Sequence, residues 1–198
     1  MPEQESVTHP KPLTRMAHDA LGAVLQPGNL AIDATVGNGH DSLFLARCVG
    51  ASGTVLGLDV QARALQRARL RLREAGTPAR CHFRLTGHEH LASEVAALGL
   101  GSPQAVTFNL GYLPGSDKSV VTRPGTTVAA LTQALQLLAP GGLISLLAYR
   151  GHPGGQEEAG AVEQLLDSLD RDRFGLHRES GRQPSAQSPI LYLVHKHL

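Results

Sequence analysis

Apolar positions follow two alternating spacings along most of the chain. Short apolar runs typical of buried strands are each followed by a stretch whose apolar residues recur at helical intervals. This alternation predicts a parallel sheet that is covered by helices on both faces. The expected strands are 29–35, 54–59, 81–86, 105–110 and 143–149, and the expected helices are 13–26, 40–48, 62–75, 91–98, 128–139 and 155–169.

The last third of the chain departs from this alternation. Two strand-like runs, 173–179 and 190–197, are separated only by a loop rich in Gly, Ser, Gln and Pro, which predicts an antiparallel hairpin. We therefore expect one α/β domain over residues 13–198, with a seven-stranded, mostly parallel sheet, after a disordered polar tail at 1–12. Thr126 or Thr127 is expected to cap the helix at 128–139.

Composition indicates the cellular compartment of the protein more than its function. The two cysteines, Cys48 and Cys81, are far apart and have no ligand partners at zinc spacing, as is usual in a reducing compartment. The chain contains neither a signal-like start nor an apolar run of about twenty residues, so we expect a soluble, cytoplasmic protein that makes no use of a membrane. The net charge of +1 neither indicates nor excludes an RNA partner.

The stretch 31–41 joins the first expected strand to a helix through a glycine turn. Gly37 and Gly39 allow a tight turn next to a helix N-terminus, a geometry that suits a nucleotide cofactor but also serves ordinary turns. Asp33 ends this strand and Asp59 ends the next, about twenty positions after Gly39, where an acid commonly binds ribose hydroxyls. The third glycine of the dinucleotide fingerprint is missing, which disfavours an NAD-dependent dehydrogenase.

Unusual loops follow every parallel strand. Ligands of such sheets bind outside the carboxyl ends of the strands, so these loops should converge on one cleft. We expect His88 or Glu89 to reach the adenine end of a cofactor. A metal site at His88, Glu89 and His90 is not expected, because residues two apart point to different sides and no third ligand is near. The converging loops are 37–41, 59–61, 87–89, 109–118 and 150–153.

Asn109 is the most informative candidate for chemistry. It ends a buried strand, where an unpaired amide is costly, and it precedes Gly111-Tyr112-Leu113-Pro114. The arrangement is similar to the Asn/Asp-Pro-Pro-Tyr element of amino-methylating enzymes, in which a side-chain and a backbone carbonyl accept the hydrogens of the substrate amine. The alternative is an ordinary strand-end asparagine in a plain turn.

Three segments together, 35–42, 108–118 and 149–153, resemble the small methyltransferases labelled as the putative rRNA methylase family. Members of that family have been assigned as tRNA 5-aminomethyl-2-thiouridine methyltransferases. The resemblance covers about residue 13 to the C-terminus. It implies a Rossmann-like class I methyltransferase that uses S-adenosylmethionine and acts on the aminomethyl group of a wobble uridine in the tRNA anticodon region.

The resemblance also implies roles for particular residues. The cofactor side would comprise Gly37, Asn38, Gly39, Asp41, Asp59, Gln61 and His88, and the substrate side Asn109, Tyr112, Asp117, Lys118, Tyr149 and His152. The positions of Asp33, Glu89 and Asn109 at or after strand ends add these three residues to the expected cofactor side. The sequence departs from the family pattern at Val36, Ser42, Ser116 and Arg150. Of these, Arg150 matters most, because a guanidinium in place of an imidazole favours phosphate contact over proton transfer.

RNA phosphates and the amine proton need further groups. Lys118, Arg123 and Arg150 are candidates for phosphate contact, whereas the arginines at 63, 67 and 71 fit a solvated helix face and are only a fallback. His152 is the first candidate to receive the amine proton, before Tyr149 and Asp117.

Other functions remain open at this stage. An rRNA or small-molecule amine methyltransferase and a non-catalytic nucleotide-binding module are both alternatives, and the apolar terminal hairpin suggests a homodimer edge.

Overall fold

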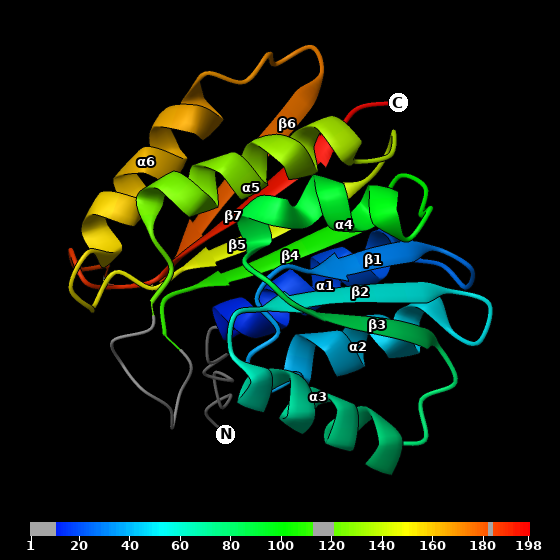
Figure 1. Cartoon of the computed structure of the whole chain (residues 1–198). Coiled ribbons are helices and arrows are strands. Elements are labelled where there is room, and N and C mark those ends of the chain that lie inside the picture. The colour runs from blue at the N-terminus through cyan, green and yellow to red at the C-terminus, as the bar shows by residue number, and fades with distance from the viewer. Residues whose placement is uncertain (1–10, 113–120, 182–183) are drawn as a thin grey trace, which may run out of the picture.

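One seven-stranded sheet organises the computed structural model, which describes residues 11–112, 121–181 and 184–198 (Figure 1). The strand order is β3-β2-β1-β4-β5-β7-β6. The strands are β1 (Leu30–Asp33), β2 (Thr54–Asp59), β3 (Arg80–Leu85), β4 (Ala105–Leu110), β5 (Leu143–Ala148), β6 (Phe174–Ser180) and β7 (Ile190–Lys196).

The pairing agrees with the sequence prediction. The first five strands are parallel, and Ile32 of β1 lies in register with Leu56 of β2 on one side and Val106 of β4 on the other. The predicted hairpin is also confirmed, since β7 is antiparallel to β6 and to β5. β7 therefore inserts between β5 and β6, and the sheet becomes mixed only at this edge.

Helices cover both faces of the sheet (Figure 1). On one face lie α1 (Leu13–Val24), α2 (His40–Val49) and α3 (Ala62–Glu74), and on the other η1 (His88–His90), α4 (Leu91–Ala97), α5 (Pro124–Leu137) and α6 (Gly155–Asp167). The predicted inner stripe of α3 is confirmed, because all four of its members are buried: Ala64, Leu65, Ala68 and Leu72.

α5 begins earlier than predicted. Pro124 occupies its first turn, where a fixed φ suits the helix and the missing N–H is not needed, and Arg123 is the N-cap. Neither Thr126 nor Thr127 caps the helix, so that prediction was wrong. Thr127 instead lies inside the first turn and is buried.

The sequence also predicts a disordered polar tail at 1–12 and no membrane-spanning segment. Most of the expected tail, residues 1–10, lies outside the described residues, and α1 begins at Leu13. No helix in the described ranges is long and apolar enough to span a bilayer.

Candidate cofactor and substrate site

A cavity of about 790 Å³ opens at the carboxyl ends of the parallel strands. Loops that follow β1, β2, β3, β4 and β5 all contribute to its wall, so the predicted convergence is confirmed. The volume lies within the range of sites for small molecules and cofactors. Among the predicted site residues its lining includes Gly37, Asn38, Asp59, Gln61, His88, Glu89, Asn109, Tyr112, Arg123, Tyr149 and His152.

Asp59 joins the first two loops at this cavity. Its Oδ2 accepts a hydrogen bond from the Gly37 N–H at 2.9 Å, and its Oδ1 accepts one from the Gln61 N–H at 2.8 Å. Burial raises the pKa of the Asp59 carboxyl. Each carboxylate oxygen has a second lone pair, so the residue can still accept a hydrogen bond from a ligand hydroxyl.

Gly39 packs against a helix and does not line the cavity. It has a left-handed backbone conformation, with φ of 76°, and a Cβ at this position would lie 2.6 Å from the Cα of Ala68 in α3. Glycine therefore allows α3 to approach the turn. The predicted contact of Gly39 with cofactor stays a prediction beside this packing role.

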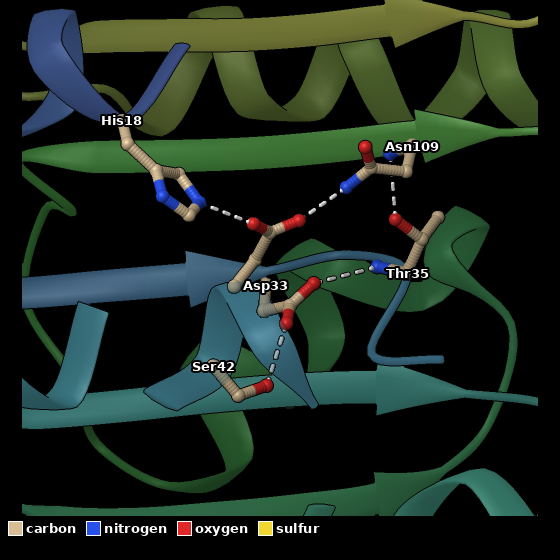
Figure 2. Close-up of polar contacts among 6 residues, drawn as sticks. His18, Asp33, Thr35, Ser42 and Asn109 are labelled. Carbon is tan, nitrogen blue, oxygen red and sulfur yellow. Dashed lines mark hydrogen bonds and ion pairs between the residues drawn. The ribbon is translucent and has the colours of Figure 1, made fainter. Parts of the chain in front are cut away.

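Asp33 lies beneath the glycine turn and is fully buried. Its Oδ1 accepts a hydrogen bond from the Thr35 N–H at 3.2 Å, and its Oδ2 accepts one from the Ser42 hydroxyl at 2.5 Å (Figure 2). Burial, followed by the negative charge of Asp41, raises the pKa of Asp33 to about 7. Asp33 does not line the cavity, and its carboxyl supports the turn from inside, so direct contact between Asp33 and cofactor stays an untested prediction.

Asp41 and Asn109 form a chain of hydrogen bonds (Figure 2). The Asn109 side-chain amide donates to Oδ2 of Asp41 at 2.5 Å, and the Asn109 N–H donates to the Thr35 hydroxyl at 2.7 Å. Nε2 of His18, in α1, lies 2.6 Å from Oδ1 of Asp41. Asp41 thus holds Asn109 rather than facing the cavity, and His18 was not identified from the sequence.

His88 and Glu89 follow β3 and line the cavity, whereas their place at the adenine end of a cofactor stays a prediction. The His88 ring is buried and packs against the Phe108 ring at a steep angle, with 6.1 Å between ring centroids. Burial lowers the pKa of His88, which favours the neutral imidazole. The Glu89 main-chain carbonyl accepts a hydrogen bond from Gln133, which fixes the short helix η1 against α5.

Two aromatic residues and a histidine form the opposite wall. Tyr112 and Tyr149 are 40% and 42% exposed, and the Tyr112 ring meets the His152 ring edge-on at 6.0 Å. Burial of its hydroxyl region, followed by the charge of Asp41, raises the pKa of Tyr149. Asp117 and Lys118 lie outside the described residues.

His152 has one ring nitrogen occupied and one without a partner. Nδ1 lies 3.0 Å from the Pro153 carbonyl oxygen, which accepts a hydrogen bond in the tautomer protonated at Nδ1. That tautomer leaves the lone pair on Nε2, which is buried and has no hydrogen-bond partner in the described part of the chain. An acceptor nitrogen with no partner suits a proton-accepting role.

Glu158, in the first turn of α6, is a buried acid that the sequence pattern did not reveal. Its carboxylate accepts hydrogen bonds from the hydroxyls of Thr122 at 2.7 Å and Thr127 at 2.5 Å. The Thr122 oxygen in turn accepts one from the Gly111 N–H at 2.9 Å. Glu158 therefore ties the segment after β4 to α5 and α6. In the sequence Glu157 and Glu158 resemble a pair of surface acids, but only Glu157 is exposed.

The arginines have contacts that differ from those predicted. Arg67 and Arg71 of α3 donate to the side-chain and main-chain oxygens of Asn38 at 2.8 and 2.9 Å, so the expected solvated face was wrong for these two. Arg150 lies away from the cavity lining and donates to the carbonyls of Ser188 and Ser185 at 2.7 and 2.9 Å. Arg123 is exposed at the cavity wall.

The described ranges contain no group of three His, Cys, Asp or Glu side chains placed to hold a metal ion. The cavity is lined by the Asp59 carboxylate, which can accept hydrogen bonds from ribose hydroxyls, by the buried His88 ring and by the Asn109 amide. Such a site can hold a nucleoside-like cofactor next to a polar substrate.

The strand order and the cavity at the strand ends define the class I methyltransferase fold. The chain belongs to the family described as "Putative rRNA methylase", whose model matches residues 55–195. It is 34% identical to a putative rRNA methylase from Clostridium thermocellum, with a TM-score of 0.89 over 96% of this chain and 100% of that one. A putative methyltransferase from Streptococcus mutans, solved in complex with SAH, is 32% identical, with a TM-score of 0.83 over 95% and 99% of the two chains.

A curated relative carries a more specific name. The chain is 40% identical over 165 residues to the chloroplastic tRNA (mnm(5)s(2)U34)-methyltransferase of Arabidopsis thaliana. The match includes 80% of this chain, which spans 60% of the length of that relative.

Proposed function

We propose that this protein is an S-adenosylmethionine-dependent methyltransferase that methylates the 5-aminomethyl group of a uridine or 2-thiouridine at the tRNA wobble position. The observation that carries the proposal is the position of Asn109, whose amide faces the same cavity as Asp59 and the glycine turn. The name of the Arabidopsis relative and the SAH held by the Streptococcus relative support the choice of substrate and cofactor.

The cofactor fits the half of the cavity formed by the first three loops. Asp59 would accept hydrogen bonds from the ribose hydroxyls, Gly37 and Asn38 would face the methionine end, and Gln61 and His88 would border the adenine. When bound, the cofactor would supply a methyl group carried on a positively charged sulfur. The bond between the methyl carbon and sulfur would break as the bond between that carbon and the amine nitrogen forms.

The substrate amine would be oriented by carbonyl oxygens. Asn109 holds its Nδ2 against Asp41, so Oδ1 is the end of the amide that can accept a hydrogen from the amine. The Leu110 carbonyl accepts the Tyr149 N–H at 3.2 Å and keeps a second lone pair for the other hydrogen. The rate gain from such positioning comes from holding the nucleophile in line with the methyl group.

The amine must lose a proton before it can attack. His152 is the first candidate to receive it, because the tautomer that donates to Pro153 leaves Nε2 as an acceptor. Tyr149 is a weaker candidate, since its raised pKa favours the protonated phenol. Asp117 remains a candidate from the sequence alone.

The RNA contacts are proposed from charge. Arg123 is exposed beside the cavity and can reach a phosphate, and Lys118 remains a candidate from the sequence. Arg150 would have to give up its bonds to Ser185 and Ser188 to do the same. A cytoplasmic location and a homodimer are further predictions, which fractionation and light scattering would test.

Two measurements test the function. Mass spectrometry of tRNA nucleosides from a deletion strain should find the unmethylated aminomethyl uridine accumulated, and the purified protein with S-adenosylmethionine should convert it in that tRNA. Unchanged tRNA with altered rRNA would favour an rRNA methyltransferase. Tight cofactor binding without transfer to any RNA or small amine would instead indicate a nucleotide-binding module.

A further inference from the structure

A histidine outside the cavity is linked to the proposed amine-binding amide through one carboxylate. Resting on the function proposed above, we infer that His18 and Asp41 are positioning residues, which hold the Asn109 amide so that Oδ1 faces the substrate amine. The three side chains come from α1, from α2 and from the end of β4. His18 and Asn109, both labelled in Figure 2, bind the two oxygens of the Asp41 carboxylate. His18 and Asp41 do not line the cavity.

The Asn109 amide has to be held in one of its two orientations because of its hydrogen-bonding chemistry. Its two ends have nearly the same shape, but one only accepts hydrogen bonds and the other only donates them. A reversed Asn109 would present its NH₂ group to the amine, where two donors would face each other. Ionised Asp41 can only accept, so its 2.5 Å contact selects the orientation in which Nδ2 points to Asp41.

His18 fixes the carboxylate that makes this selection. Its Nε2 lies 2.6 Å from Oδ1, so the two oxygens of Asp41 have separate partners and the carboxylate cannot rotate freely. The His18 ring stacks on Phe44 of α2, with centroids 4.0 Å apart and planes 4° from parallel. The side chains of His18 and Asp41 are only 25% and 23% exposed, which limits competition from water.

The charge of Asp41 acts on two neighbouring titratable groups. Asp33 lies beneath the same turn, and the charge of Asp41 contributes to its raised pKa. Tyr149 also feels that charge from the cavity side. His18 offers Asp41 a hydrogen bond at Oδ1, the carboxylate oxygen that Asn109 does not bind.

The test compares two replacements of His18 with a neighbour on the same helix. His18→Phe keeps a flat ring for stacking on Phe44 but removes the donor, whereas His18→Gln keeps a donor without the ring. Asp19→Asn is the matched control, because Asp19 pairs with Lys11 and Arg15 on the exposed side of α1. Turnover and KM are measured with aminomethyl-uridine tRNA, and cofactor affinity is measured by calorimetry.

We expect His18→Phe to lower kcat on the order of tenfold, as for loss of a charge-assisted hydrogen bond, with cofactor affinity unchanged. His18→Gln should recover much of this loss, and Asp19→Asn should behave as wild type. Wild-type kcat in His18→Phe would overturn the inference. So would a joint fall of kcat, cofactor affinity and melting temperature that His18→Gln fails to relieve, because this pattern describes a fold defect.

A second readout does not depend on activity. The side-chain ¹⁵N–¹H signals of Asn109, assigned by their loss in Asn109→Ala, report the hydrogen bond to Asp41 directly. They should move in His18→Phe and in Asp41→Asn but not in Asp19→Asn, and signals that stay in place in both would overturn the inference. If the wild-type protein methylates no amine, the proposed function fails, and these signals still decide whether His18 orients the amide.

Discussion

The Arg67 guanidinium donates a hydrogen bond to the side-chain oxygen of Asn38 at 2.8 Å, and so links the middle of α3 to the glycine turn at the cavity. Arg71 adds a bond to the Asn38 carbonyl, so the turn is held from outside. We predict that Arg67→Met, which keeps the aliphatic stem, weakens S-adenosylmethionine binding about tenfold in calorimetry. Arg63→Met on the exposed surface of α3 is the control, and equal affinities in the two variants would contradict the prediction.

Asn109→Ala should separate binding from turnover. The variant removes the amide that we propose binds the substrate amine and leaves Asp59 and the glycine turn in place, so we predict a fall in kcat of about 100-fold or more with cofactor affinity retained. Calorimetry with S-adenosylmethionine beside a tRNA methylation assay measures both. Loss of both properties would assign a structural role to Asn109.

His152→Ala should change the shape of the pH–rate profile. If Nε2 receives the amine proton, the variant loses turnover most where the substrate amine is still protonated, that is, toward lower pH. His177→Ala on the exposed part of β6 provides a control with the same chemical change. Full turnover of His152→Ala at every pH would exclude it as the base.

Asp33→Asn should flatten the pH dependence of stability. A folded-state pKa of about 7 against an ordinary 3.8 means that the folded protein binds this proton more tightly than the unfolded chain. The resulting stabilisation is complete below the unfolded value and is lost as the pH rises through about 7. An amide does not titrate and can still bond to Thr35 and Ser42.

Urea unfolding at about pH 5 and about pH 8 measures the effect of this substitution, since the linkage between protons and folding sets the difference between the two values. The free energy of unfolding should fall more between these two pH values in wild type than in Asp33→Asn. Equal falls in both proteins would show that Asp33 does not carry the dependence.

Glu158→Ala should destabilise the fold as well as the site. The substitution leaves the hydroxyls of Thr122 and Thr127 without their acceptor inside the protein, so we predict a loss of about 2–4 kcal/mol in the free energy of unfolding. Glu157→Ala, at the exposed neighbouring position, should change it little. Chemical denaturation of both variants gives the comparison, and similar losses would contradict the prediction.

The fold was predictable from the sequence because its signals are local and regular. Each buried strand is an apolar run, each helix has an apolar stripe, and the placement of loops at one sheet edge follows from parallel strands. The early start of α5 was missed because Pro124 was assigned to a loop, although proline is well suited to a first helical turn.

The supporting contacts were less accessible, because they depend on how helices pack. Nothing in the spacing of α1 indicates that His18 meets Asp41, 23 positions away. In the sequence Asp33 and Asp59 are both acids at strand ends. In the structure Asp33 is buried under the glycine turn, whereas Asp59 lines the cavity. Direction and burial of a side chain are tertiary properties that a sequence pattern leaves open.

The antiparallel course of β7 has a consequence for the rim of the site. β7 runs opposite to β5, and its first residue, Ile190, pairs with Ala148, the last residue of β5. The segment before β7 therefore lies at the carboxyl end of β5, next to the cavity. Gln187 in that segment lines the cavity, and Arg150 clamps the segment through two carbonyls. The terminal hairpin thus contributes to the rim of the cavity, although its strands lie at the edge of the sheet beyond the five parallel strands.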